Sequence, residues 1–365
     1  MILPPSSASR ITLHVSPLPL RASRITHHLF PYLRFMTSRK YNWAILGCGK
    51  IAGKFSSDLK LLPNARLYAA ASRDIVKSES FASKYGFEKA YGSYEEMAND
   101  PNVDIIYVAT PHSHHRDHAI LCLERGKAVL VEKAFALTTG ECNQMIDIAK
   151  RNKVFLMEAF WTRFQPSFQK VVEVLESGYL GAARMMRSEF CFFSPYIAEN
   201  RLYNLALGGG SLLDIGVYPL FWAYQIFGKP SEIQTTVDLA PSGADRSMAM
   251  TLKYPGGGIA QLASSFAVCS DTQTEIWCEK GFIRVRKADP QTVKVTVSKK
   301  EILEEEFSFR FDKGFGLFLE AQHVMDCLDK GLLESDLLPL SFTLDQMQLM
   351  DKIRAMTGVR YPGEI

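Results

Sequence analysis

Hydrophobic positions in the first half of the chain alternate between short apolar runs and longer stretches with helical spacing. Apolar runs bounded by turn residues predict strands, and amphipathic stretches predict helices. We expect strands at 41–46, 66–71, 103–109, 128–131 and 154–157, with helices between them up to about 61 and at 74–85, 117–125 and 139–151. Because this alternation is typical of a doubly wound parallel sheet, residues 37–158 are predicted to form an α/β domain.

The pattern changes in the second half of the chain. Helical spacing at 166–177 and 212–227 flanks a strand at 184–193, and short alternating runs follow at 248–254, 258–265, 274–278, 282–286, 292–298 and 302–309. Such runs predict a large, mostly antiparallel sheet. With closing helices at 317–329 and 344–357, residues 159–365 are predicted to form an α+β domain whose last helix packs back on the first domain. One face of this open sheet is left for a partner subunit.

The first predicted strand runs directly into a glycine-rich turn that precedes a helix. The turn reads Gly47-Cys48-Gly49-Lys50-Ile51-Ala52, a G-x-G-x-x-A pattern. In a dinucleotide-binding turn the first glycine allows the tight turn, the second lets the backbone approach a pyrophosphate, and the small sixth residue lets helix and strand pack closely. The phosphates then lie at the helix N-terminus, whose free N–H groups attract an anion. We therefore predict a Rossmann domain.

The end of the second strand indicates which dinucleotide is bound. The sequence there is Ser72-Arg73-Asp74, whereas an NAD enzyme usually has an acid at the first position, where it binds the ribose 2′-hydroxyl. A hydroxyl and a guanidinium suit a 2′-phosphate. These residues favour NADP over NAD, although Arg73 could also be an ordinary solvated side chain.

Two further strand ends carry polar residues. The first is Thr110-Pro111-His112-Ser113-His114-His115, which we interpret as a loop that contacts the cofactor through Thr110, Pro111, His112 and His115. We predict no metal, because the histidines cross a strand-to-helix turn and no carboxylate or cysteine pattern completes a site. The second is Glu132-Lys133, either a structural ion pair or, because it faces the cleft, part of the catalytic machinery.

A glycine-led helix carries the remaining candidate residues. Gly208-Gly209-Gly210-Ser211 opens the helix at 212–227, with Ser211 as the expected N-cap. Asp214 and Tyr218 are four residues apart and therefore share a face. A carboxylate inside an apolar helix needs a partner or a function. Tyr218 is either a core tyrosine or a catalytic one whose pKa a neighbouring Lys133 would lower.

Charge and composition narrow the possible functions. The formal charge is +3 and the hydrophobic fraction is 47%, which gives no reason to expect nucleic acid as a partner. Seven scattered cysteines without a C-x-x-C indicate a reducing compartment. The longest nearly apolar run, 212–227, contains Asp214 and is shorter than the roughly 18 residues of a membrane span.

Residues 1–36 form a separate extension with a different composition. No acid occurs before Asp58, and six basic residues lie before Tyr41, so the rest of the chain has a charge of about 3 − 6 = −3. The extension is either an organellar transit peptide or an upstream segment before a functional start at Met36. We expect a cytoplasmic protein in the second case and an organellar one in the first.

Together these residues resemble the glucose–fructose oxidoreductase and inositol dehydrogenase family, over about Tyr41 to Gly363. The shared pattern is the glycine turn, a Thr-Pro loop, a Glu-Lys-Pro motif, and a glycine-led helix with an Asp four residues before a His or Tyr. Four stretches resemble a branch of the family that oxidises trans-dihydrodiols and D-xylose. They are Met157 to Phe164, Asp214 to Tyr218, His323 to Gly331, and Gly358 to Pro362.

The resemblance implies a role for each candidate residue. Lys133 and Tyr218 would be catalytic with Asp214 in support, and Glu132, Trp161 and Arg163 would join the loop histidines in contacting cofactor or substrate. It implies an NADP-dependent dehydrogenase acting on a D-xylose-like aldopyranose or a trans-dihydrodiol, and a homodimer. Alternatives are a member acting on another sugar or an inositol, and a non-catalytic NADP-binding regulator. One departure is Ala134, where the family motif has proline.

Overall fold

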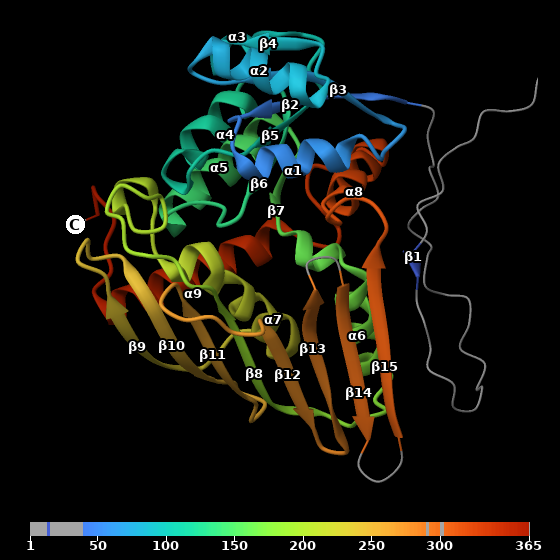
Figure 1. Cartoon of the computed structure of the whole chain (residues 1–365), viewed down its shortest axis with the longest axis vertical. Helices are drawn as coiled ribbons and strands as arrows, with labels where there is room; N and C mark the ends of the chain where they lie inside the picture. The colour runs from blue at the N-terminus through green and yellow to red at the C-terminus, as the bar shows by residue number, and fades with distance from the viewer. Residues whose placement is uncertain (1–12, 15–38, 290–291, 300–302, 365) are drawn as a thin grey trace, which may run out of the picture.

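The computed structural model describes residues 13–14, 39–289, 292–299 and 303–364. Two domains lie one above the other, with the parallel-sheet domain over a wide second sheet (Figure 1). One contiguous hydrophobic core runs through both, from Trp43 in the first strand of the upper domain to Ile283 in the lower sheet. The predicted fold class, a doubly wound parallel sheet with helices followed by a large, mostly antiparallel open sheet, is confirmed.

The upper domain has a six-stranded, fully parallel sheet of order β4-β3-β2-β5-β6-β7. Its strands are β2 (Tyr41–Leu46), β3 (Ala65–Ala71), β4 (Lys89–Tyr91), β5 (Ile105–Val108), β6 (Ala128–Glu132) and β7 (Leu156–Ala159). Its helices are α1 (Lys50–Leu59), α2 (Ile75–Tyr85), α3 (Tyr94–Asn99), α4 (His115–Leu123) and α5 (Thr139–Asn152), with the short turn η1 (His112–His114) before α4. The sequence did not predict β4 and α3, because three and six residues are too few to establish a period.

The lower domain is built on a nine-stranded sheet of order β1-β15-β14-β13-β12-β8-β11-β10-β9. Its neighbours pair antiparallel except β8 with β11, which run parallel. The strands are β1 (Leu13–His14), β8 (Ala183–Cys191), β9 (Glu232–Leu239), β10 (Asp245–Lys253), β11 (Ile259–Ser265), β12 (Gln273–Cys278), β13 (Gly281–Asp289), β14 (Thr292–Lys299) and β15 (Leu303–Phe311). The sequence missed β9 because this edge strand buries no side chain fully, so it has no apolar face to mark it.

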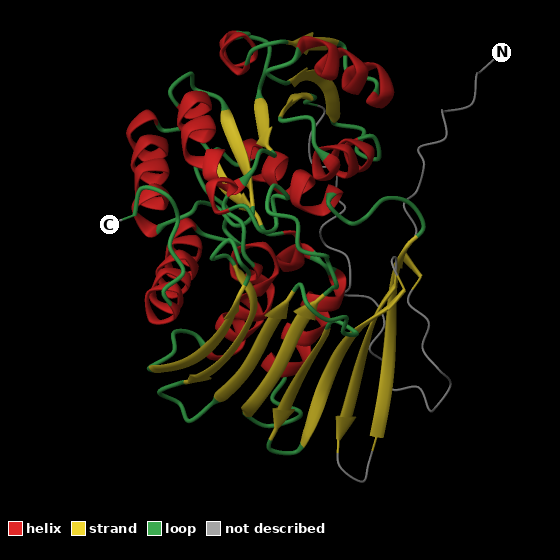
Figure 2. Cartoon of the chain, turned by 60° about the vertical axis from the view of Figure 1, so that its left-hand side comes forward, coloured by secondary structure: helices red, strands yellow, loops and turns green. Residues whose placement is uncertain are grey.

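Helices cover one face of this sheet, and no described helix covers the other (Figure 2). They are α6 (Pro166–Glu176), α7 (Val217–Phe227) and α9 (Leu340–Thr357). The second half of the chain also contains the short turns η2 (Trp161–Phe164) and η3 (Leu205–Leu207), and α8 (Phe318–Asp329), which packs against α1 of the upper domain (Figure 1). Among the described residues one segment, Leu205–Phe227, is long and apolar enough to cross a membrane, but 78% of its most apolar 18 residues are buried inside the fold. It is the core helix of the lower domain.

Only two residues of the 1–36 extension are described. Leu13 and His14 form β1, which pairs antiparallel with the edge strand β15 at Phe311 and Arg310. The sequence did not predict this contact, and the other residues of the extension lie outside the described part of the chain.

The glycine-led helix differs from its prediction at its start. Residues Leu212–Gly216 form one π-helical turn, η4, before α7 continues in α geometry. Ser211 makes no capping hydrogen bond to the helix, which corrects our expectation. Instead the buried carboxylate of Asp245 on β10 accepts hydrogen bonds from the Leu212 backbone N–H at 2.6 Å and from the Ser211 hydroxyl at 2.9 Å. A residue on β10, distant in the sequence, therefore caps this helix, and the local sequence around the helix start could not predict this contact.

Candidate active site

The glycine turn has the geometry that a dinucleotide requires. Gly47 has a φ of +99°, and a Cβ there would lie 3.0 Å from the Ala109 carbonyl oxygen and 2.9 Å from the Thr110 methyl group. Gly49 is the N-cap of α1, and no side chain bonds the first amides of that helix. No acidic residue occupies its first turn. The free amides and the helix dipole therefore fit a pyrophosphate.

Two cations lie near that turn: Arg73, just after β3, and Lys77, in the first turn of α2. The Asp74 carboxylate caps α2 by accepting hydrogen bonds from the Val76 and Lys77 amides, so it is occupied within the protein. Arg73 is exposed and lies close enough to Tyr94 to oppose the rise in the pKa of Tyr94 that burial causes. Lys77 acts in the same way on Cys48, whose pKa burial raises to about 11. Sequence reasoning missed Lys77, which lies one helical turn beyond the strand end.

The Thr-Pro loop is fixed by its own histidines. Both ring nitrogens of His115 lie against backbone carbonyl oxygens, 2.8 Å from Thr110 and 2.9 Å from Ala134, and the side chain is fully buried. His115 therefore joins the loops after β5 and β6 and does not reach outward. His112 is also buried, and its Nδ1 lies 3.0 Å from the Gly208 carbonyl oxygen. Because only a protonated Nδ1 can bond that carbonyl, Nε2 is the acceptor nitrogen of a neutral His112.

Lys133, Asp214 and Tyr218 come together from two different domains. The Lys133 ammonium, at the end of β6, donates to the Asp214 backbone carbonyl at 2.5 Å and lies 3.5 Å from the Asp214 carboxylate. Its nitrogen is 5.1 Å from the centre of the Tyr218 ring. The indole N–H of Trp161 donates to the Tyr218 hydroxyl at 3.1 Å. These four side chains form one cluster, as expected of the candidate residues. The peptide bond between Lys133 and Ala134 is cis.

Arg201 completes the cluster and was missed from sequence. Its guanidinium lies 3.0 Å from the same Asp214 oxygen that faces Lys133. Arg201 lies in an irregular segment between β8 and η3, which has no period and no motif. The only available signal was that a buried Asp214 needs compensating charge.

Glu132 and Arg163, two further candidates from the sequence, contact residues around the cluster. Glu132 is buried behind Lys133, accepts a hydrogen bond from the Tyr107 hydroxyl, and accepts the Lys133 backbone N–H at 3.2 Å. Arg163 donates through Nε to the Leu337 carbonyl at 3.0 Å, so its head points toward the segment before α9. Arg163 thus holds η2, the turn that carries Trp161.

Burial and charge set the protonation of the cluster. Burial raises the pKa of Asp214, but Lys133 and Arg201 outweigh it and hold the value at about 2. Burial lowers the pKa of Lys133, but Tyr218, Asp214 and Glu132 raise it above its ordinary range. For Tyr218, burial raises the pKa by more than Lys133 lowers it. Lys133 acts on the pKa of Tyr218 in the expected direction, but burial outweighs it, so the expected net lowering is wrong for this arrangement, which holds an ionised Asp214, a Lys133 cation and a neutral Tyr218.

Comparisons with known proteins agree with the two domains described above. Residues 41–160 match the oxidoreductase family with an NAD-binding Rossmann fold, and residues 168–284 match the GFO/IDH/MocA C-terminal domain. A Mus musculus protein named trans-1,2-dihydrobenzene-1,2-diol dehydrogenase is 36% identical over 331 residues, covering 88% of this chain and 98% of the relative. The Homo sapiens protein of that name is 35% identical over 333 residues, with the same coverage.

Solved structures show the same fold. An aldose-aldose oxidoreductase from Caulobacter crescentus, complexed with glycerol, is 25% identical with a TM-score of 0.77, covering 87% of this chain and 97% of that one. A levoglucosan dehydrogenase complexed with NADH has a TM-score of 0.77 at 17% identity, covering 88% of this chain and all of its own.

The glycine turn, the two sheets and the polar cluster between them define an NAD(P)-dependent oxidoreductase acting on CH–OH groups. The chain belongs to the GFO/IDH/MocA oxidoreductase family.

Asp245 offers a test of how the cluster is positioned. Burial raises the pKa of Asp245 to about 6, while its bonds to the Leu212 backbone and Ser211 lower it. The unfolded carboxyl ionises near 3.8 and the folded one near 6. The fold therefore loses stability as pH rises between those values, by up to about 3 kcal/mol. We expect Asp245→Asn to keep the cap and to gain stability relative to wild type over that pH range, with little change below it.

Asp245→Ala is the matched variant. It leaves the Leu212 amide without a partner, so we expect its free energy of unfolding to fall by about 1–3 kcal/mol. We also expect it to lose turnover, whereas Asp245→Asn should retain turnover. Urea unfolding at pH 4 and pH 7, together with kcat and KM, measures both effects. Equal stability of the Ala and Asn variants would show that the carboxylate does not cap the helix.

Proposed function

We propose that this chain is an NADP-dependent dehydrogenase that oxidises a ring hydroxyl of a trans-dihydrodiol or of a D-xylose-like aldopyranose. The observation that carries the proposal is the cluster of Lys133, Asp214 and Tyr218, located at the carboxyl edge of the parallel sheet near the glycine turn. Ligands bind such sheets at that edge. The curated relatives at 35–36% identity are named for the dihydrodiol reaction.

The residues at the end of β3 support NADP as the cofactor. A 2′-phosphate needs cations and a hydroxyl, which Arg73, Lys77 and Ser72 provide, while the nearest acid, Asp74, is occupied as a helix cap. A related 3-ketoreductase structure contains NADP and the levoglucosan dehydrogenase contains NADH, so the fold serves both nucleotides. The residues of this chain favour the phosphorylated one.

Each side chain of the cluster has a distinct part in the reaction. When bound, the nicotinamide accepts a hydride from the carbinol carbon. Tyr218 and Lys133 hydrogen-bond the reacting hydroxyl, and one of them, deprotonated, takes its proton as the carbon is oxidised. Asp214 holds the Lys133 ammonium, and Trp161 fixes the direction of the phenol. An aldopyranose gives a lactone, and a trans-dihydrodiol gives a ketone that tautomerises to a catechol.

Replacing either proton-transfer residue should abolish most turnover. We expect Tyr218→Phe and Lys133→Met each to lower kcat by about 10²–10⁴-fold, because general acid–base catalysis contributes that much. Wild-type oxidation should accelerate with rising pH, because the pKa values of both groups are raised and the base must be deprotonated. NADPH formation with benzene dihydrodiol, D-xylose, D-glucose and inositol as substrates measures these rates and separates the proposal from a member acting on inositols.

Tyr224→Phe is the matched control, because Tyr224 lies on the same helix and donates to Asp345 outside the cluster. It should retain turnover. A Tyr218→Phe variant as active as Tyr224→Phe would remove Tyr218 from the mechanism. NADPH binding without turnover on any of these substrates would favour a non-catalytic regulator.

The cofactor assignment has its own test. We expect Arg73→Ala to raise KM for NADP by about tenfold or more, the cost of losing a hydrogen bond to a charged group, with KM for NAD unchanged. Lys84→Ala, near the far end of α2, is the control. A variant that weakens NAD and NADP equally would contradict a 2′-phosphate contact.

We also propose a cytoplasmic homodimer joined through the open face of the lower sheet. The exposed face of β8, β9, β10 and β11 is hollowed and largely polar, lined by residues such as Arg187, Glu189, Gln234, Thr251 and Gln261. All seven cysteines are free, as a reducing compartment requires. Light scattering of the purified chain measures its mass, and a monomer would contradict the assembly.

A further inference from the structure

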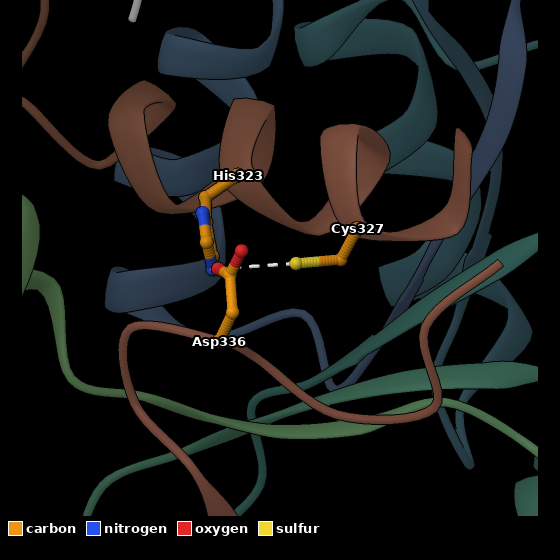
Figure 3. A group of neighbouring side chains, drawn as sticks. All are labelled: His323, Cys327 and Asp336. Atoms are coloured by element: carbon orange, nitrogen blue, oxygen red, sulfur yellow. Dashed lines mark hydrogen bonds and ion pairs between the residues drawn. The ribbon is translucent and has the colours of Figure 1, made fainter. Parts of the chain in front are cut away.

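A cluster of three potential metal ligands lies on α8, apart from the glycine turn and the Lys133 cluster. His323 and Cys327 are four residues apart on α8, so they share one face of the helix. Asp336 approaches them from the segment that follows α8 (Figure 3). Within the described ranges this is the group whose His, Cys and acidic ligand atoms all lie within 4.8 Å of one another.

The spacing of these atoms fits a tetrahedral ion. His323 Nε2 lies 3.3 Å from Cys327 Sγ and 3.6 Å from an Asp336 carboxylate oxygen. Zinc binds imidazole nitrogen and carboxylate oxygen at about 2.0–2.2 Å and thiolate sulfur at about 2.3 Å, so tetrahedral ligands lie roughly 3.3–3.6 Å apart. The two distances from His323 Nε2 agree with that geometry, and the ligand atoms of Cys327 and Asp336 lie within 4.8 Å of each other.

We propose that His323, Cys327 and Asp336 bind a zinc-type divalent transition-metal ion. Imidazole and thiolate select zinc-like ions over magnesium and calcium. On binding, the Cys327 thiol releases its proton to solvent, and the thiolate and carboxylate together balance the charge of the ion. The fourth position is open to water.

The surroundings can accommodate the ion. One Asp336 oxygen faces His323, and the other lies 3.1 Å from the Lys330 ammonium, so Lys330 can orient the carboxylate while it binds metal. His323 and Cys327 are buried, whereas Asp336 is exposed and provides an entry path. The Ser335 hydroxyl, now 2.7 Å from His323 Nε2, also accepts the Leu338 amide and keeps that bond when the ion takes the imidazole.

The ion would join α8 to the segment that holds η2. Ser335 also accepts the Leu337 amide, and the Leu337 carbonyl accepts the Arg163 guanidinium. Arg163 lies two residues beyond Trp161, which bonds the Tyr218 hydroxyl. The proposed site is therefore a structural clamp near the active site and adds no ligand to the reaction.

Titration of the chelator-treated, full-length protein with Co²⁺ alone tests the proposal. We expect one Co²⁺ per chain, with a thiolate-to-cobalt charge-transfer band and the visible bands of a tetrahedral site. Zn²⁺ should displace the cobalt, bleach both bands, and raise the melting temperature of the wild-type protein. Absence of a thiolate band with metal in excess would overturn the proposal and leave a purely hydrogen-bonded cluster.

Variants locate the bound ion. Cys327→Ser should abolish the charge-transfer band, while Cys269→Ser, which removes the exposed cysteine of another segment, should leave it intact. Because Cys327 is buried, we use a second variant on the surface, Asp336→Asn. The affinity of this variant for Co²⁺ should fall by at least about 10–100-fold, which is the cost of losing a residue that only supports a metal ligand. Binding that survives both Cys327→Ser and Asp336→Asn would refute the assignment.

Discussion

The ion pair between Lys133 and Asp214 is the contact on which the site depends. Lys133 ends a strand of the upper domain and Asp214 lies in the first turn of a helix in the lower one, yet their charged atoms are 3.5 Å apart. Each charge would be strongly unfavourable in this buried place without the other. The pair therefore joins the two domains beside the end of β6, where the proposed reaction would take place.

Holding Asp214 in that place requires a constrained backbone at the start of its helix. Gly210 has a φ of +131°, and a Cβ there would lie 2.1 Å from a carboxylate oxygen of Asp245. The same Asp245 caps the helix through the Leu212 amide, so the glycine and the acid are one arrangement. From the sequence, the glycines before this helix indicated only that a helix starts there. In the structure they leave room for Asp245, on β10, to reach the start of the helix.

The sequence predicted most of the fold and most of the side chains that meet in the Lys133 cluster, because each has a local signal. Five of the six parallel strands follow from apolar runs, and Lys133 follows from its place just past one. What the sequence could not predict depends on tertiary contacts. Arg201 is recognisable only once Asp214 is seen beside it, Asp245 caps a helix more than 30 residues earlier, and β9 has no buried face. The protonation state of Tyr218 depends on how far burial raises its pKa against how far Lys133 lowers it, and residue spacing alone does not predict that outcome.

The balance of charge in the cluster bears on how a substrate hydroxyl would lose its proton. Lys133 and Arg201 both face Asp214, so two cations lie beside one ionised carboxylate, and Glu132 lies behind Lys133. In the reaction that we propose, these cations would stabilise the negative oxygen that develops as the hydroxyl loses its proton. Arg201, which no sequence motif marks, would thereby contribute to the reaction through its charge.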